Sequence, residues 1–176
     1  LFVISAPSGG GKSTVLRAVL KADSTLSYSV SATTREPRTG EKDGGDYYFR
    51  TREEFERLIE QDAFIENAHV HGYYYGTLRE EVDRKLRERK DVILDIDVQG
   101  SLALKKERPD TVTIFILPPS IATLEKRLRS RGLDNEDTMR VRLENARNEI
   151  RYAQRYDYIM VNEDLGRTIE NIRNVI

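Results

Sequence analysis

The 176-residue chain contains no cysteine and no tryptophan, and its 29 basic residues nearly balance its 30 acidic residues. Without cysteine it forms neither disulfides nor thiolate metal sites, which is typical of a reducing compartment. A formal net charge of −1 excludes a field that would draw the whole protein to nucleic acid or to a membrane surface. No run approaches the roughly 20 apolar residues that span a bilayer, and residues 1–4 are too short an apolar run for a signal peptide. We therefore expect one soluble, cytoplasmic domain, residues 1–176, with no nucleic acid, membrane or obligatory protein partner.

A glycine-rich segment near the start of the chain has the pattern of a phosphate-binding loop. Residues 6–14 read Ala-Pro-Ser-Gly-Gly-Gly-Lys-Ser-Thr, between an apolar run and a segment with helical spacing. They match G-x-x-x-x-G-K-[ST] except at Ala6. The glycines let backbone N–H groups and the positive end of the next helix point at a phosphate. Lys12 supplies a mobile charge for the transferred phosphoryl group, and the Ser13 hydroxyl is placed to bind Mg²⁺. The alternative is a glycine-rich turn, which the flanking strand and helix disfavour.

Two acids end the apolar run that starts at residue 91. Side chains alternate across a strand, so Asp95 and Asp97 are expected on the same side of it. In phosphate-loop enzymes an acid at such a strand end completes the magnesium site, although an acidic pair could instead cap the next helix. The phosphate loop favours the magnesium interpretation.

The segment from about residue 33 to 77 is polar and turn-rich, which is typical of an inserted region that carries a site. Arg35 and Arg38 are three apart in an irregular loop, a spacing that lets two guanidinium groups hold one phosphate dianion. Taken alone, this loop is more simply interpreted as a solvated turn. Glu66 is either a ligand or an outward-facing residue. His69 and His71 lack a third ligand nearby, so we expect no metal there.

Strand-like and helical segments alternate along the chain. We expect strands at 1–4, 26–30, 64–70, 72–76, 91–97, 111–117 and 158–161, and helices at 51–59, 78–89 and 165–176 and after residues 14, 120 and 134. Thr51 and Glu54 form a capping-box pattern, and Ser120 is a further N-cap. The alternation predicts an α/β fold of three layers with a central, mostly parallel sheet, whose ligands bind at the carboxyl ends of the strands. The helices after residue 120 carry Arg127, Arg131 and Arg142 and by themselves are typical of a solvated surface.

The chain resembles the guanylate kinases over nearly its whole length. The resemblance is carried by residues 6–13, 30–41, 46–47, 64–66, 74–77, 93–100 and 161–162. It implies a P-loop nucleoside monophosphate kinase that passes the γ-phosphoryl group of Mg²⁺-bound ATP to GMP or dGMP in purine nucleotide metabolism, with no tightly bound organic cofactor. It further implies a core of about 1–32, 78–122 and 150–176, an inserted GMP-binding region of about 33–77 and a helical lid of about 123–149.

The same resemblance implies roles for individual residues. The catalytic set is Lys12, Arg38, Arg131 and Arg142. The ATP-binding set is Ala6, Pro7, Ser8, Gly9, Gly10, Gly11, Lys12, Ser13, Thr14, Arg127 and Asn162. GMP is assigned to Arg35, Arg38, Tyr47 and Tyr75 at its phosphate and to Ser31, Glu66, Thr77 and Asp97 at its guanine. Mg²⁺ is assigned to Ser13 and Asp95.

Two other functional classes share parts of this pattern. Guanylate-kinase-like domains of scaffold proteins bind peptides without catalysis, but Lys12, Ser13 and the lid arginines argue against that class. Ribose bisphosphate kinases share the phosphate loop but have no use for a guanine reader, so Glu66 and Thr77 argue against them.

Overall fold

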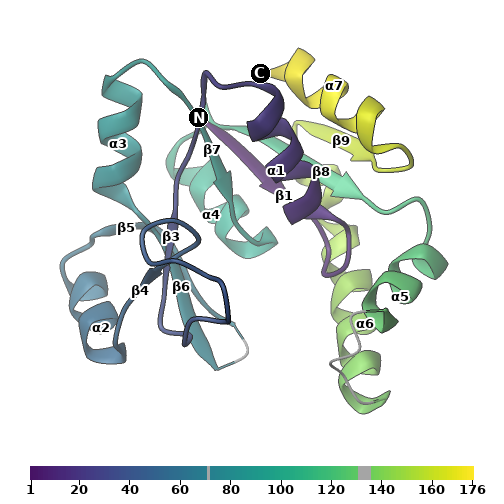
Figure 1. Ribbon diagram of the computed structural model, residues 1–176, viewed down its shortest axis with the longest axis horizontal. Helices are drawn as coiled ribbons and strands as arrows, with labels where there is room; N and C mark the ends of the chain where they lie inside the picture. The colour runs from purple at the N-terminus through teal and green to yellow at the C-terminus, as the bar shows by residue number, and fades with distance from the viewer. Residues whose placement is uncertain (71, 131–135) are drawn as a thin grey trace.

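A five-stranded parallel sheet positions the glycine-rich loop (Figure 1). In the computed structural model, which describes residues 1–70, 72–130 and 136–176, the strand order is β2-β7-β1-β8-β9. The bounds are β1 Phe2–Ser5, β2 Leu26–Tyr28, β7 Asp91–Asp95, β8 Val112–Leu117 and β9 Tyr158–Val161. The three central strands are apolar almost throughout, because parallel strands are covered on both faces.

Helices cover both faces of this sheet and make the three layers that the alternating pattern predicts. On one face, α1 (Lys12–Ala22) and α7 (Leu165–Val175) bury Val15, Val19 and Ile172 against β1, β7 and β8. On the other face, α3 (Arg79–Arg87) and α4 (Val98–Glu107) bury Val82 and Leu104. The α/β prediction with a parallel central sheet is confirmed.

A second sheet lies to one side of the first (Figure 1). Its strand order is β4-β3-β6-β5, with β3 Ser31–Thr33, β4 Tyr48–Phe49, β5 Phe64–Val70 and β6 Tyr73–Leu78. Helix α2 (Arg52–Glu60) packs on it through Phe55, whose ring stacks on Phe64 at 4.4 Å between centroids. The predicted strand 26–30 is therefore wrong in its extent: β2 ends at Tyr28, and the chain enters the second sheet at Ser31.

Helices α5 (Ile121–Arg129) and α6 (Glu136–Arg151) extend from the other side of the main sheet (Figure 1). They pack together through Leu124, Leu128, Met139 and Ala146. A short 3-10 helix (Ala153–Arg155) leads from α6 to β9. Arg131 and His71 lie outside the described residues.

Side chains cap several helices as their sequences predict. Thr51 Oγ1 accepts the Glu54 N–H and the Glu54 carboxylate accepts the Thr51 N–H, which confirms the capping box of α2. Ser120 caps α5 through the Thr123 N–H. The predicted strand 91–97 is too long, because β7 ends at Asp95 and Asp97 is the N-cap of α4. Asp97 therefore caps the next helix, as the alternative interpretation of the acidic pair proposed.

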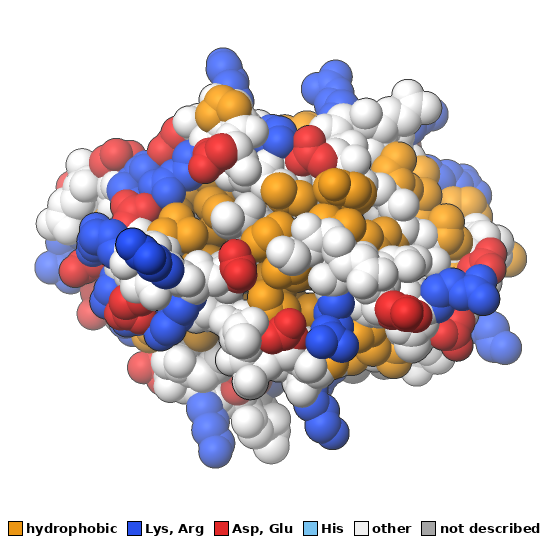
Figure 2. All heavy atoms as spheres, turned by 90° about the horizontal axis from the view of Figure 1, so that it is seen from above, with side chains coloured by type: hydrophobic (Ala, Val, Ile, Leu, Met, Phe, Trp, Pro, Cys, Tyr) orange, Lys and Arg blue, Asp and Glu red, His pale blue; other side chains and the backbone are white. Residues whose placement is uncertain are grey.

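Figure 2 shows the molecule from above, on the side where both chain ends lie in Figure 1. Apolar side chains gather across the middle of this face, and charged side chains of both signs lie toward its ends. No helix among residues 1–70, 72–130 and 136–176 combines the length and the apolar character that a membrane crossing requires.

Glycine at position 76 sets how closely β6 approaches its neighbours. A Cβ added to Gly76 would lie 2.7 Å from Phe64 Cδ1 and 3.1 Å from the Glu66 carbonyl oxygen. We expect Gly76→Ala to lower the free energy of unfolding by about 1–3 kcal/mol, because it overpacks the Phe64 side of the sheet. Urea denaturation measures this change.

The matched control is Gly45→Ala, because a Cβ there would meet its nearest atoms at 3.6 Å, an ordinary contact. It should change stability by less than about 0.5 kcal/mol. Equal stability of the two variants would contradict the close-packing argument.

Candidate active site

The glycine-rich loop joins β1 to α1 and has the geometry of an anion cradle. The Gly10 N–H donates to the Pro7 carbonyl oxygen at 2.7 Å, and Gly11 is the N-cap of α1. Gly9 and Gly11 have φ of 82° and 96°, in the left-handed region that favours glycine. A Cβ at Gly11 would also lie 2.8 Å from Asn162 Nδ2. Each glycine of the motif therefore meets a steric requirement, and the N-terminus of α1 faces the loop.

Lys12 reaches from this loop to the end of the neighbouring strand. Its Nζ lies 2.5 Å from Asp95 Oδ1 and donates to the Ile96 carbonyl oxygen at 3.3 Å. The register of β1 and β7, with Ile4 opposite Asp95, brings the two residues together. Burial disfavours the charged lysine, but the carboxylate of Asp95 outweighs it and raises the pKa of Lys12. The ammonium is therefore fully charged at neutral pH.

The donor set at this point suits a magnesium ion. Ser13 and Asp95 line the same cavity and offer a hydroxyl and a carboxylate oxygen, which are hard ligands. The part of the chain that the structure describes contains no group of three or more His, Asp or Glu side chains that could hold a metal. A magnesium ion bound by two side chains takes its remaining ligands from water and nucleotide phosphates.

A cavity of about 290 Å³ lies between the two sheets and contains the expected guanine-reading acids. Its lining includes Ser31, Glu66 and Asp97. Thr77 Oγ1 donates to Glu66 Oε1 at 2.7 Å. A Cβ at Gly100 would lie 2.6 Å from Glu66 Oε2, so only glycine at this position of α4 leaves room for the carboxylate. The four predicted residues thus converge, although they come from four separate segments.

Glu66 is the acid whose ionisation the site perturbs most clearly. Burial raises its pKa to about 7, and the nearby negative charge of Asp97 acts in the same direction. The hydrogen bond from Thr77 opposes this shift, because it favours the ionised carboxylate. Near neutral pH, the Glu66 carboxyl is therefore protonated far more often than that of an exposed glutamate.

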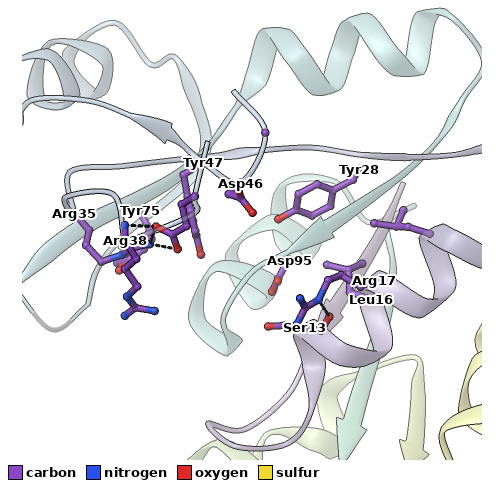
Figure 3. A pocket seen from close by; sticks show the side chains of 13 residues that line it. Ser13, Leu16, Arg17, Tyr28, Arg35, Arg38, Asp46, Tyr47, Tyr75 and Asp95 are labelled. Carbon is purple, nitrogen blue, oxygen red and sulfur yellow. Dashed lines mark hydrogen bonds and ion pairs between the residues drawn. The ribbon is translucent and has the colours of Figure 1, made fainter. Parts of the chain in front are cut away.

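A second cavity, of about 690 Å³, adjoins the first and contains the predicted phosphate-binding residues (Figure 3). Arg35, Arg38, Tyr47 and Tyr75 all line it. The Tyr47 and Tyr75 rings meet edge to face at 6.1 Å. Ser13, Tyr28, Tyr47, Tyr75 and Asp95 line both cavities, so the space runs continuously from Glu66 to the start of α1.

A third cavity, of about 380 Å³, lies on the opposite side of the loop. Its lining includes Gly9, Gly11, Thr14, Arg127 and Asn162. Arg127 Nη1 donates to the Gly10 carbonyl oxygen at 3.3 Å, and the buried Asn162 side chain lies beside Gly11. Arg142, on α6, is not among the residues that line these three cavities.

Three residues that the motifs did not single out also line the first or the second cavity. Tyr28 ends β2 with its side chain in the cavity, where burial raises the pKa of its hydroxyl (Figure 3). Glu149, on α6, accepts the Ser8 N–H at 3.1 Å. Glu41 accepts two contacts from Arg35 Nη2, each at 2.9 Å. Glu149 lies 141 positions from Ser8, so sequence pattern carries no sign of their contact, whereas Glu41 follows two arginines closely enough to be suspected.

Comparison with known proteins agrees with this geometry. The family model described as "Guanylate kinase" matches residues 1–176. Guanylate kinases of Caldanaerobacter subterraneus subsp. tengcongensis and Thermotoga maritima are each 47% identical to this chain over all of its length and 85% of theirs. A crystal structure of guanylate kinase from Anaplasma phagocytophilum, 38% identical, superimposes with a TM-score of 0.81 over 99% of this chain and 82% of that one. The chain belongs to the guanylate kinase family and has its P-loop kinase fold.

Proposed function

We propose that this chain transfers the γ-phosphoryl group of Mg²⁺-bound ATP to GMP or dGMP, giving ADP and GDP or dGDP. The observation that carries the proposal is the pair of adjoining cavities whose linings include the Glu66 carboxylate, two arginines and the first residues of α1. A guanine reader and two phosphate-binding arginines in adjoining cavities, next to a phosphate loop, suit a guanine nucleotide beside a nucleoside triphosphate.

The acceptor base is read by hydrogen-bond acceptors. Guanine presents its N1–H and its exocyclic amino group as donors, and a carboxylate accepts both. We assign this role to Glu66 with Asp97, supported by Ser31 and Thr77. The two strand registers that place Ser31 and Glu66 beside Thr77 support this assignment. Adenine lacks this pair of donors and would leave the carboxylates without partners.

The phosphates are held by cations and by backbone N–H groups. We assign the GMP phosphate to Arg35, Arg38, Tyr47 and Tyr75, and the ATP phosphates to residues 6–14. We assign the ATP nucleoside to the third cavity, which Arg127 and Asn162 line. Mg²⁺, held by Ser13 and Asp95, neutralises phosphate charge when bound.

Phosphoryl transfer depends mainly on positioning and charge neutralisation. A GMP phosphate oxygen attacks the γ-phosphorus in line, the bond to the ADP oxygen breaks, and Lys12 follows the moving group. We assign residues 33–77 and 123–149 to mobile parts whose closure excludes water and brings Arg131 and Arg142 to the phosphates. The remaining segments, 1–32, 78–122 and 150–176, form the core.

The decisive experiment is a coupled assay with ATP, Mg²⁺ and a panel of acceptors. We expect strong selection for GMP, with dGMP used, IMP weakened because it lacks the amino group, and AMP and UMP rejected by roughly 10⁴-fold. Comparable turnover of AMP or UMP would exclude the guanine assignment. Preference for ribose 1,5-bisphosphate would indicate the sugar kinase class, and no transfer to any acceptor would indicate a binding module.

Lys12→Ala should abolish transfer while leaving the protein folded, because the ammonium acts on the moving phosphoryl group. The expected loss is at least about 3 kcal/mol of transition-state stabilisation, or more than about 100-fold in kcat. The control is Lys21→Ala, which removes an exposed ammonium from the last turn of the same helix. Near-normal turnover of the Lys12 variant would remove the loop from the mechanism.

GMP use should also depend on the ionisation of Glu66. The pKa of Glu66 in the protein without GMP is about 7. Because guanine donates hydrogen bonds to the ionised carboxylate, GMP binding should lower this pKa and release a proton. The KM for GMP should therefore fall roughly tenfold as pH rises from about 6 to about 8. Initial rates at constant saturating ATP measure this change.

Glu66→Gln separates this effect from the titration of the GMP phosphate, which both proteins share. The variant should use GMP poorly, without gaining use of AMP, and should lose the part of the pH dependence centred near 7. Calorimetry in two buffers of different ionisation enthalpy should detect more proton release with the native protein than with the variant, because both share the release from the GMP phosphate. Identical pH profiles would contradict the role of Glu66.

A further inference from the structure

One carboxylate connects both arginines of the phosphate-binding cavity. Glu41 Oε1 and Oε2 each lie 2.9 Å from Arg35 Nη2. Oε2 also accepts the Arg38 backbone N–H at 2.8 Å, and the Glu41 N–H donates to the Arg38 carbonyl oxygen at 3.0 Å. Glu41 thus fixes the guanidinium of one arginine and the backbone of the other.

The Arg35 guanidinium is held on several sides. Nη1 donates to the Glu36 carbonyl oxygen at 2.7 Å, and the guanidinium carbon lies 5.4 Å from the centre of the Tyr47 ring. The Arg35 side chain is only 11% exposed. These hydrogen bonds engage Nη1 and Nη2, and the Tyr75 side chain also interacts with the guanidinium.

The Arg38 side chain, unlike that of Arg35, is not held in place by the protein. It is exposed, and it makes no hydrogen bond or ion pair with the described residues. Only its backbone is anchored, through Glu41. The cavity therefore pairs one arginine that is already in place with one that is free to turn onto a phosphate.

The charges agree with a permanent contact. The hydrogen bond from the Arg38 N–H, with Arg35 acting in the same direction, lowers the pKa of Glu41. The Glu41 carboxylate in turn raises the pKa of Arg35, against the effect of burial. Both groups are ionised at any pH at which the enzyme would work.

We propose that Glu41 is a positioning residue for the acceptor phosphate: it sets the spacing of Arg35 and Arg38 before the nucleotide arrives. This inference rests on the proposed function, because it takes the bound anion to be the GMP phosphate. A guanidinium that is already ordered loses little side-chain freedom when the phosphate binds, so the contact gains affinity. A carboxylate that merely occupied the anion site would act in the opposite direction and weaken GMP binding.

The test compares Glu41→Gln with Glu36→Gln. Both changes remove one negative charge from the same loop, but the Glu36 side chain is exposed and makes no hydrogen bond or ion pair with the described residues. Calorimetry with GMP, guanosine and ATP measures binding, and initial rates measure KM and kcat. For Glu41→Gln we expect the Kd and KM for GMP to rise at least tenfold, while kcat and the Kd values for guanosine and ATP change less than twofold. Glu36→Gln should change each of these by less than twofold.

Two further variants separate positioning from simple support of the fold. In an Arg35→Ala background, Glu41→Gln should change GMP affinity less than threefold, because its main partner is already gone. Glu41→Asp keeps the charge on a shorter side chain and should restore part of the lost affinity. It also carries the test if the glutamine variant does not fold.

Four outcomes would overturn the proposal: tighter GMP binding by Glu41→Gln, unchanged GMP binding, an equal loss of guanosine binding, or full additivity with Arg35→Ala. The native protein supplies the reference, since it should bind GMP more tightly than guanosine. A native protein without that preference would overturn both the proposed function and this inference. Native preference with equal behaviour of the two glutamine variants would overturn this inference alone.

Discussion

The parallel pairing of β1 with β7 is the constraint on which the site depends. Ile4 lies opposite Asp95, so the loop that leaves β1 starts beside the acid that ends β7. The 2.5 Å contact between Lys12 Nζ and Asp95 Oδ1 joins the two strand ends. Because β7 leads through Asp97 into α4, the same pairing also places Asp95, Ile96 and Asp97 in the lining of the 290 Å³ cavity. A shift of register between β1 and β7 would move the glycine-rich loop away from both Asp95 and Asp97.

Several charged and polar groups of the site are paired with one another. Lys12 faces Asp95, Arg35 faces Glu41, and the Ser8 N–H of the loop donates to Glu149. Unpaired buried charges would be costly, so these contacts let the protein fold with a highly polar cavity. Arg38 and Glu66 are exceptions. The Arg38 side chain makes no ion pair with the described residues. Glu66 contacts the neutral Thr77 and lies near Asp97, which carries the same charge, and burial raises the pKa of Glu66 to about 7. Lys12 and Arg35 are thus fixed by ion pairs within the protein, which suits the phosphate-binding roles proposed for them.

Much of the main sheet and its motifs could be predicted from local pattern. The apolar strands, the helix caps at Thr51 and Ser120 and the glycine-rich loop each depend on residues within a few positions of one another. Where prediction failed, a long-range contact decided the outcome. Ser31–Thr33 is not among the predicted strands, yet it forms a buried strand because β4 and β6 flank it. Asp97 reads as a strand residue, yet it caps α4 because the chain turns after Asp95.

The sequence by itself determined which chemistry is available: a phosphate loop, paired arginines, acids at a strand end, and a pattern typical of guanylate kinases. Only the tertiary structure decided which of these groups meet. Glu66 and Thr77 are brought together by an irregular register between β5 and β6, and Gly100 makes room for the carboxylate from another helix. The Glu149 contact with Ser8 spans 141 positions. Such contacts depend on how whole layers pack, which no local spacing of residues encodes.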